Sequence, residues 1–408
     1  MSASHSGSIT TDEILAFRRD TRGTAFVNHL NNAGASLMPD IVTQAIREHI
    51  DLESTIGGYE AAAARSAEIG LFYDRAAQLL GTLRSNIAFT ASATDSFTRA
   101  LSSVPFREGD VILTDIDDYI SNQIQFLSLR KRLGLRVEHI RNAETGGVDL
   151  QDLAEKLDRL KPRLLAITHI PTNSGLMQPA REIGEVYHRY RQAAGEHSWY
   201  ILDACQSAGQ VRLDVGGLHC DFLSATSRKF LRGPRGAGFL YVSDRALRAG
   251  LEPLFIDMRG AKWTGRESYE QRVDATRFED WEFAYALVLG TSAAIDYCLR
   301  IGEDRIRQRV DALSARMRAA VGTLDRVRVL DRGPELGGLV TFTVAGAGPE
   351  LLVKELSRRK INVVASYREF AVIDFGLKDV EWAIRASPHY FNTEAEVEAL
   401  AEALGEII

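Results

Sequence analysis

The sequence predicts an α/β fold followed by a smaller α+β unit, and three observations support that prediction. Short apolar runs alternate with helical patterns through the first two thirds of the chain, which is the signature of α/β proteins. Most of these runs are apolar at nearly every position, as strands covered on both faces should be. At 408 residues, the chain is also longer than a single hydrophobic core normally supports. We therefore expect one large domain and one smaller domain.

The expected strands of the first part are short apolar runs bounded by turn residues. They cover residues 86–90, 110–116, 136–140, 164–170, 199–204, 221–226 and 236–242. Apolar residues spaced three and four apart predict the helices around them. These helices cover residues 41–54, 59–80, 95–103, 119–133, 149–160 and 180–194.

The pattern changes near residue 283, where a long helix is expected over 283–301, continuing to about 322. Strands are then expected in "VRVL", "GLVTFTV", "INVVAS" and "FAVIDF", and a last helix begins at Glu394. We expect residues 1–30 to pack on a small domain of residues 281–408, and residues 31–280 to form the large domain.

Composition limits the classes of function. The net charge of −6 and the pI near 5.9 give no basic face for nucleic acid, and charges of both signs are interspersed. No apolar run approaches the ~20 residues that span a bilayer, and no leader pattern precedes the fold. The three cysteines form neither a CxxC pair nor an even framework. We expect a cytoplasmic protein that binds a small molecule, without nucleic-acid or membrane partners.

In an open α/β sheet, function resides in loops at the carboxyl ends of strands, and two such loops here carry polar residues among small ones. In "FTASATDSFTRAL", a loop of small residues precedes a helix that begins at Thr94 or Asp95. The free N–H groups of that helix can bind an anion, although an ordinary helix cap also explains the pattern. In "THIPTNSG", Asn173 can donate to a ligand or complete a turn.

Two further loops carry charged residues. Asp203 follows the apolar run 199–202, so its carboxylate is expected near the buried end of a strand. A carboxylate there needs a partner, and a structural arginine, a helix cap or a ligand would supply one. Lys229 lies in "ATSRKFLRGPRGAGFLYV", next to Arg228 and near Arg232. Neighbouring cations and burial make a lysine a nucleophilic amine, whereas a solvated basic loop is the alternative.

Together, these four loops match the needs of one cofactor. Pyridoxal 5'-phosphate (PLP) requires an anion site for its phosphate, donors for its phenolic oxygen, a carboxylate beside its pyridinium nitrogen and an amine that forms a Schiff base. An anion loop, an amide, a buried carboxylate and a lysine occur on successive strands of this chain. The sequence therefore favours a PLP enzyme.

The chain resembles the class V aminotransferase family of fold-type I PLP enzymes over nearly its whole length. This family includes cysteine desulfurases, isopenicillin N epimerase-like proteins and carbon-sulfur lyases. The strongest marker is "DFLSATSRKFLRGPRGAGFLYV", which is similar to the family's strand, lysine and glycine-rich run. The resemblance implies a mixed, mostly parallel seven-stranded sheet sandwiched by helices. It also implies that Lys229 forms the Schiff base and that Thr226 and Arg228 contact the phosphate.

Other motifs extend the resemblance to the rest of the cofactor site. "LDACQSAGQ" is similar to the family's D-x-x-Q, which implies that Asp203 is the pyridinium partner and that Gln206 donates to the phenolic oxygen. Asn173 falls where family members have an asparagine near that oxygen. "SATD" resembles the phosphate loop and assigns that role to Ala93 and Thr94. Tyr119 in "DDYISN" takes the ring-stacking position that is commonly histidine.

The substrate side is implied by two segments at opposite ends of the chain. "IRASPHYFNT" is similar to the family's R-x-S segment, which makes Arg385 the expected partner of a substrate α-carboxylate. "LNNAGASLMP" resembles the segment that lines the substrate side, with Asn32, Ala33 and Gly34 near that carboxylate. A helix cap followed by a proline turn is the alternative explanation of this second segment.

One departure from the family bears on the reaction. Desulfurases of this family carry a cysteine in the loop upstream of the carboxylate arginine, and here "NVVASYREFAV" has Ser366, Tyr367 and Arg368 instead. A thiolate is needed to take up sulfur. We expect Cys205, Cys220 and Cys298 to be buried structural residues instead. The sequence thus predicts that the enzyme is not a conventional cysteine desulfurase.

A second departure concerns the partner subunit. Where desulfurases show a Gly-Thr pair that reaches the partner's phosphate, this chain has Trp281 and Glu282, so the sequence does not predict that contact. The preceding segment could still reach a partner's site. There Arg259, Trp263 and Arg266 either contact a distal part of a substrate or belong to an ordinary exposed loop.

The expected function is PLP-dependent chemistry on an α-amino acid, with Lys229 as the base for the α-proton. We favour β-elimination at a sulfur-substituted substrate, of the ergothioneine-pathway or cysteine-conjugate kind. Transamination and epimerisation use the same residues and stay open. A non-catalytic protein that keeps the fold for binding is the alternative of another class. The family resemblance also predicts a homodimer.

Overall fold

The computed structural model describes residues 7–195 and 197–408, and its main feature is a seven-stranded sheet in the order β2-β8-β7-β6-β5-β3-β4. The strands are β2 (Ile87–Thr90), β3 (Val111–Thr114), β4 (Arg136–His139), β5 (Leu164–Thr168), β6 (Trp199–Asp203), β7 (Phe222–Thr226) and β8 (Gly238–Val242). β8 runs antiparallel to β2 and β7, and every other neighbouring pair is parallel. The predicted α/β fold with a mixed, mostly parallel sheet is confirmed.

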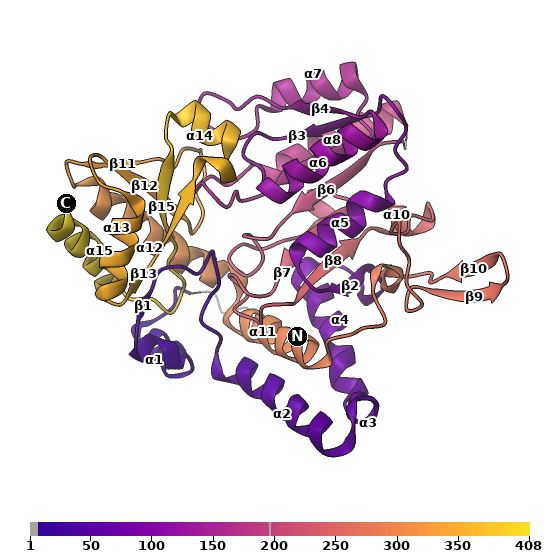
Figure 1. The fold of residues 1–408 in the computed structure, drawn as a ribbon, viewed down its shortest axis with the longest axis horizontal. Helices are drawn as coiled ribbons and strands as arrows, with labels where there is room; N and C mark the ends of the chain where they lie inside the picture. The colour runs from indigo at the N-terminus through magenta and orange to yellow at the C-terminus, as the bar shows by residue number, and fades with distance from the viewer. Residues whose placement is uncertain (1–6, 196) are drawn as a thin grey trace.

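Helices flank this sheet on both faces (Figure 1). Alternate residues of β6 show how the strands divide between the faces. Trp199 and Ile201 belong to one apolar cluster with Phe97 and Phe126, whereas Leu202 belongs to a second cluster on the opposite face. The first face carries α5 (Ala93–Ser103) and α6 (Ile120–Leu133), and the second carries α4 (Ser66–Leu80), α7 (Leu150–Leu160) and α8 (Ala180–Ala194). Both faces are covered, which explains the nearly continuous apolar strands.

A second, antiparallel sheet has the order β11-β12-β15-β14. Its strands are β11 (Val327–Val329), β12 (Val340–Val344), β14 (Val364–Tyr367) and β15 (Trp382–Ala386). They share one apolar cluster with α12 (Glu303–Gly322), α13 (Pro349–Arg358) and α15 (Glu394–Ile407). α11 (Tyr285–Ile301) precedes them and packs on α2 (Asp40–Ile56) and α4.

The start of the chain lies against this second sheet. β1 (Asn28–His29) pairs in parallel with β13 (Ile361–Asn362). Arg18 of α1 (Thr11–Arg19) forms an ion pair with Glu396 at 2.9 Å. These contacts join residues 18–29 to β13 and to α15. The division of the chain into domains, with boundaries at residues 30 and 280, stays a prediction.

The structure corrects the expected strand in "FAVIDF", because residues 372–378 form the helix α14 (Val372–Lys378). Phe375 is buried, while Val372 and Leu377 are exposed. Lys378 also donates to Asp374 one turn earlier at 2.8 Å, as helical spacing allows. Apolar residues in a short run do not distinguish a strand from a helix that uses one face.

Other local differences are smaller. The expected helix over 59–80 is divided at Arg65 into α3 (Gly58–Ala64) and α4. The sequence reasoning missed β15 and the hairpin of β9 (Ala261–Gly265) and β10 (Ser268–Gln271), which projects from the body (Figure 1). Short helices complete the chain: α9 (Val215–Leu218), α10 (Asp244–Arg248) and the 3₁₀ turns η1 (Arg22–Ala25), η2 (Arg84–Asn86), η3 (Ala275–Phe278) and η4 (Arg368–Phe370). Among the described residues, no helix combines the length and the apolar character that crossing a membrane requires.

Candidate active site

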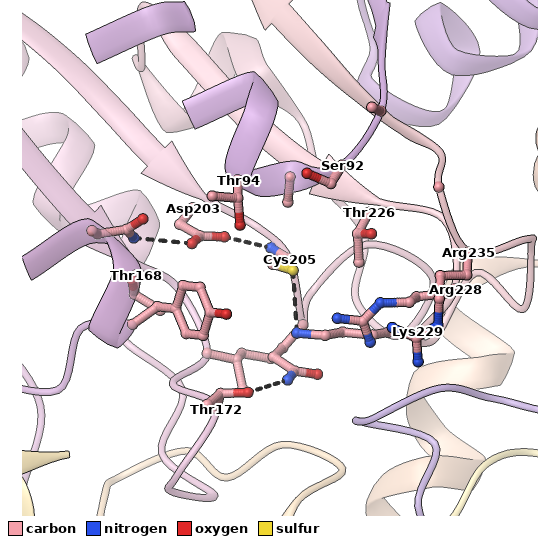
Figure 2. A pocket seen from close by; sticks show the side chains of 17 residues that line it. Ser92, Thr94, Thr168, Thr172, Asp203, Cys205, Thr226, Arg228, Lys229 and Arg235 are labelled. Carbon is pink, nitrogen blue, oxygen red and sulfur yellow. Dashed lines mark hydrogen bonds between the residues drawn. The ribbon is translucent and has the colours of Figure 1, made fainter. Parts of the chain in front are cut away.

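The carboxyl ends of the parallel strands surround a cavity of about 280 Å³ (Figure 2). Parallel neighbours place their carboxyl ends at one edge of a sheet, so residues far apart in the chain meet there. The predicted residues that line this cavity are Ala93, Thr94, Tyr119, Asp203, Gln206, Thr226, Arg228 and Lys229. The structure thus brings together the predicted cofactor residues except Asn173, and the role of each stays a prediction.

Lys229 lies three residues beyond the end of β7, with its side chain buried in the cavity. Its Nζ donates to Cys205 Sγ at 3.2 Å. No carboxylate among the described residues forms an ion pair with it, and burial, with a smaller effect of Arg228, lowers the pKa of its amine. A lowered pKa increases the neutral, nucleophilic fraction of a lysine amine. This environment favours the nucleophile over the alternative of a solvated basic loop.

Asp203 is the last residue of β6 and is buried. Its position places it on the same face of the strand as Ile201, which is the face covered by α6. Its carboxylate accepts from the backbone N–H of Cys205 at 2.8 Å and from Nδ2 of Asn122 on α6 at 3.1 Å. Burial raises the pKa of Asp203. Within the described chain the carboxylate has hydrogen-bond donors but no ion pair, so a structural arginine is not its partner.

Asn122 connects Asp203 to a second buried carboxylate. The same Nδ2 atom donates to Oδ1 of Asp118 at 2.9 Å, so both amide hydrogens are used. Burial, with a smaller contribution from the charge of Asp203, raises the pKa of Asp118 to about 6. Asn122 therefore holds two carboxylates that repel one another at fixed positions beside the cavity.

One end of the cavity, where a phosphate was expected, is formed by the start of α5. Ser92 caps the helix by accepting from the N–H of Asp95 at 3.1 Å. The first N–H groups of a helix have no carbonyl partner within it, so those of Ala93 and Thr94 are available to an anion. Gly238 of β8 allows this close packing, because a Cβ there would lie 2.7 Å from the carbonyl carbon of Ser92. The helix begins at Ala93, slightly before the expected start at Thr94 or Asp95, and the loop shows both a helix cap and free N–H groups.

Arg385 lies on β15 and is buried beside the cavity. Its Nη1 donates to the carbonyl of Thr172 at 2.9 Å, and its Nη2 donates to Oδ1 of Asn31 at 3.5 Å. Its Nε is buried without a partner among the described residues. Burial lowers the pKa of the guanidinium to about 10. A buried arginine without a carboxylate partner suits a substrate carboxylate.

The segment of Asn32, Ala33 and Gly34 braces the site without lining the cavity. The side chain of Asn32 donates to the carbonyl of Ser387 at 2.8 Å, and the N–H of Ala33 donates to the Ser387 hydroxyl at 2.9 Å. The carbonyl of Gly34 accepts from Arg228. These contacts fix the end of β15 and orient one arginine. Contact of this segment with a substrate stays a prediction.

Two predicted donors have other partners in this structure. Gln206 donates from Nε2 to Thr172 Oγ1 at 2.7 Å and to the carbonyl of Ala33 at 3.1 Å, while its Oε1 is buried without a partner. Asn173 donates to the carbonyl of Phe370 at 3.0 Å and accepts from Ser366. It lines a neighbouring cavity of about 380 Å³ rather than the first one. Thr172, the residue before it, lines the first cavity instead.

Cys205 corrects a sequence expectation. It was expected to be a buried structural residue, but β6 ends at Asp203, the chain turns there, and Cys205 is only half-buried. The thiol therefore lines the cavity and accepts from Lys229, while burial raises its pKa. Cys220 and Cys298 are buried outside this cavity, as expected.

Sequence reasoning also missed several residues that line the cavity: Asn122, Thr168, Ile170, Thr172 and Arg235. Asn122 lies one helical turn after Tyr119, and that spacing alone could have placed it on the cavity side. Arg259, expected as a possible distal contact, is instead anchored to Glu279 at 2.6 Å. Trp281 and Glu282 lie outside this cavity. The backbone N–H of Trp281 donates to Oδ1 of Asp257 at 2.7 Å.

The side chains of the cavity fit PLP. Asp203 is a buried carboxylate without a cation, Arg385 has an unpartnered buried nitrogen, and the start of α5 offers N–H groups to an anion. A pyridinium, an amino-acid carboxylate and a phosphate would satisfy these groups in turn. Lys229 would supply the amine that the aldehyde of PLP requires.

Comparison with known proteins agrees with this geometry. The family model for class-V aminotransferases matches residues 28–400. The chain belongs to the class-V aminotransferase family. Its cofactor is accordingly PLP, and one solved structure with a TM-score of 0.84 and 23% identity carries glycine covalently linked to that cofactor.

Relatives within this family include proteins named as probable cysteine desulfurases. One from Methanothermobacter thermautotrophicus is 26% identical, covering 93% of this chain and 94% of the relative. Another from Pyrococcus abyssi is 26% identical and covers 96% of both. Among solved structures, the apo cysteine desulfurase of Thermococcus onnurineus NA1 has a TM-score of 0.86 and 26% identity, with 96% of this chain and 97% of that chain covered.

These relatives overturn one sequence expectation. The prediction that the enzyme is not a conventional cysteine desulfurase is wrong, because relatives named cysteine desulfurase match the chain over nearly its full length. That prediction rested on a loop that lacks a cysteine and on the expectation that Cys205 is structural. The turn after β6 instead places the Cys205 thiol in the cavity itself.

Proposed function

We propose that this enzyme cleaves the Cβ–S bond of L-cysteine or of a sulfur-substituted cysteine. The observation that carries the proposal is the buried Lys229 amine, which shares one cavity with Asp203 and lies near Arg385. The names of the family relatives support chemistry at sulfur. S-substituted cysteines of the ergothioneine-pathway or cysteine-conjugate kind belong to the substrate class that we propose.

Bound PLP supplies an electron sink that weakens the bonds at the α-carbon of an amino acid. The residues of the chain do the rest. Lys229 removes the α-proton, because its amine is buried and has a lowered pKa. Asp203 holds a proton on the ring nitrogen, and Asn122 fixes that carboxylate. Arg385 orients the α-carboxylate with its planar guanidinium.

Cleavage of the Cβ–S bond has two chemically distinct outcomes. In β-elimination the electron pair of the bond leaves with sulfur, and hydrolysis of the remaining fragment gives pyruvate and ammonia. In desulfuration a thiol takes up the sulfur atom, the electron pair stays on carbon, and alanine is the product. Both outcomes break the bond that we propose, and the products distinguish them.

The test uses the PLP-loaded enzyme with L-cysteine, L-cystine, an S-alkyl cysteine and L-glutamate. We expect sulfur release from the cysteine compounds, together with pyruvate and ammonia or with alanine. Lys229→Ala should abolish it. Racemisation without sulfur release, or amino transfer from L-glutamate as the main activity, would instead identify an epimerase or an aminotransferase. Cofactor binding with no turnover would identify a binding protein.

We further propose that the enzyme is a cytoplasmic homodimer. Large apolar side chains are exposed on and beside the β9–β10 hairpin, including Phe255 at 85%, Val273 at 86% and Trp263 at 80%. Exposed apolar clusters of this kind favour association with another chain. All three cysteines are free, which suits a reducing compartment.

A further inference from the structure

The cavity holds more positive than negative charge. Its charged lining residues are Asp203, Arg228, Lys229 and Arg235, and Arg385 lies beside them. Many arginines of this protein are paired with acids, as Arg259 is with Glu279 at 2.6 Å. In the described chain, by contrast, Arg228, Arg235 and Arg385 form no ion pair with a carboxylate. Cations gathered without counter-ions are unfavourable, so the site is built for anions.

The arginines occupy different parts of the cavity. Arg385 lies on β15, on the side of Thr172, and is the expected partner of the substrate carboxylate. Arg228 and Arg235 lie on the side of Thr226, and Figure 2 shows their side chains next to one another. The charge of Arg235 contributes to lowering the pKa of Arg228, after burial, which is consistent with their proximity.

The backbone places Arg235 at the phosphate end. It lies in the loop between β7 and β8, three residues before Gly238, which packs against the backbone of Ser92 and Ala93. The same loop carries Lys229, so one short segment positions both the expected Schiff-base lysine and Arg235. Arg235 is exposed in a single chain, although it lines the cavity, and it has no hydrogen bond to another described side chain that would hold it away from the cavity.

We propose that Arg235 is a cofactor-binding residue whose guanidinium, together with Arg228, binds the phosphate dianion of PLP. A dianion at the start of α5 would balance both charges, and guanidinium groups match phosphate oxygens in geometry. Trp281 and Glu282 replace the residues expected to reach a partner's phosphate, and they lie outside the cavity of their own chain. Arg235 would supply that interaction from within the same chain. The inference rests on the cofactor and not on the reaction proposed above.

The test compares PLP with pyridoxal, which lacks the phosphate. The apoprotein is titrated with each compound, and the absorbance of the lysine-bound chromophore is followed. Arg235→Gln should weaken PLP binding by about 10- to 100-fold, which is the range for loss of a charge-assisted hydrogen bond. Pyridoxal binding should change by less than about twofold. The affinity of Arg235→Lys for PLP should lie between the affinities of the parent enzyme and of Arg235→Gln, because a lysine keeps the charge but not the planar fork.

Two controls separate this role from others. Arg132→Gln changes an exposed arginine of α6 that lies outside the cavity, and it should leave both affinities unchanged. At saturating PLP, the affinity of Arg235→Gln for glycine should equal that of the parent, since glycine carries the carboxylate but no phosphate. An unchanged affinity for PLP, equal weakening of PLP and pyridoxal, or weakening of glycine alone would overturn the inference. Each reading is a binding measurement, so it stands even if the enzyme proves to catalyse another reaction.

Discussion

Replacing Asp117 with asparagine should stabilise the protein above neutral pH and not below pH 4. Asp117 follows β3 and is buried, and its carboxylate accepts from Asn142 at 2.9 Å. It faces Asp374 of α14, which binds Lys378 at 2.8 Å. Burial, followed by the charge of Asp374, raises the pKa of Asp117 to about 7. The pair joins α14 to the large sheet, because its two members come from those two parts.

The sign and size of the effect follow from linkage. An unfolded aspartate has a pKa of about 3.9, so between pH 4 and 7 the folded chain holds a proton that the unfolded chain has released. The stabilising contribution of protonated Asp117 to the free energy of unfolding is therefore fully present below pH 4 and is lost as the pH rises through 7. A pKa difference of about 3 corresponds to ~4 kcal/mol. Since Asp374 and Lys378 share the titration, we expect a gain of about 2 to 4 kcal/mol for Asp117→Asn at pH 8.

The assay is urea unfolding of the PLP-loaded enzyme at pH 4.0 and pH 8.0, followed by tryptophan fluorescence. An asparagine at position 117 can still accept from Asn142 and can donate to Asp374, so packing is retained. Asp325→Asn, at an exposed position, is the control and should change the free energy of unfolding by less than about 0.5 kcal/mol at both pH values. Equal destabilisation by Asp117→Asn at both pH values would refute the reasoning, as would no gain at pH 8.

Three further outcomes are expected. Asn122→Ala should lower kcat by about 10-fold with little change in KM, because it removes one hydrogen bond from Asp203. It should also shift the pH dependence of the bound cofactor's absorbance. An unchanged absorbance titration would contradict the role assigned to this amide. Arg385→Gln should raise KM for the amino acid by about 10- to 100-fold while the affinity for PLP is retained. Steady-state kinetics and cofactor titration measure the two effects. A loss of PLP affinity alone would show that Arg385 binds the cofactor and not the substrate carboxylate. Phe255→Ser should convert the dimer to a monomer in light scattering, whereas Phe26→Ser, at a residue 70% exposed, should leave it intact.

The sheet and the cofactor residues were predictable because both depend on local pattern. Buried strands are short, apolar and bounded by turns, and polar residues at their ends are conspicuous against that background. Asp203, Thr226 and Lys229 all follow such runs. Since parallel strands place their carboxyl ends at one edge, the sequence order of these residues was enough to bring them together.

Residues that reach the site from elsewhere were harder to predict. Cys205 was misplaced because the end of β6 decides which way its side chain points, and alternation says nothing about where a strand stops. Asn122 reaches Asp203 from a helix on the flank of the sheet, across a sequence separation of 81 residues. Arg235 follows the lysine in a loop whose path depends on the packing of Gly238 against α5.

The reaction was the least predictable feature, because the loop used to exclude desulfuration is shaped by tertiary contacts. Ser366 donates to Asn173, and Asn173 donates to the carbonyl of Phe370, so the strand end of the large sheet holds the segment before α14. The expected strand there is a helix, and Asn173, which was expected in the cofactor cavity, lines the neighbouring cavity instead. The lack of a cysteine in that loop therefore concerns only the residues beside α14, and it does not exclude a role for the thiol of Cys205. Which products form from cysteine is decided by groups that meet only in the folded chain.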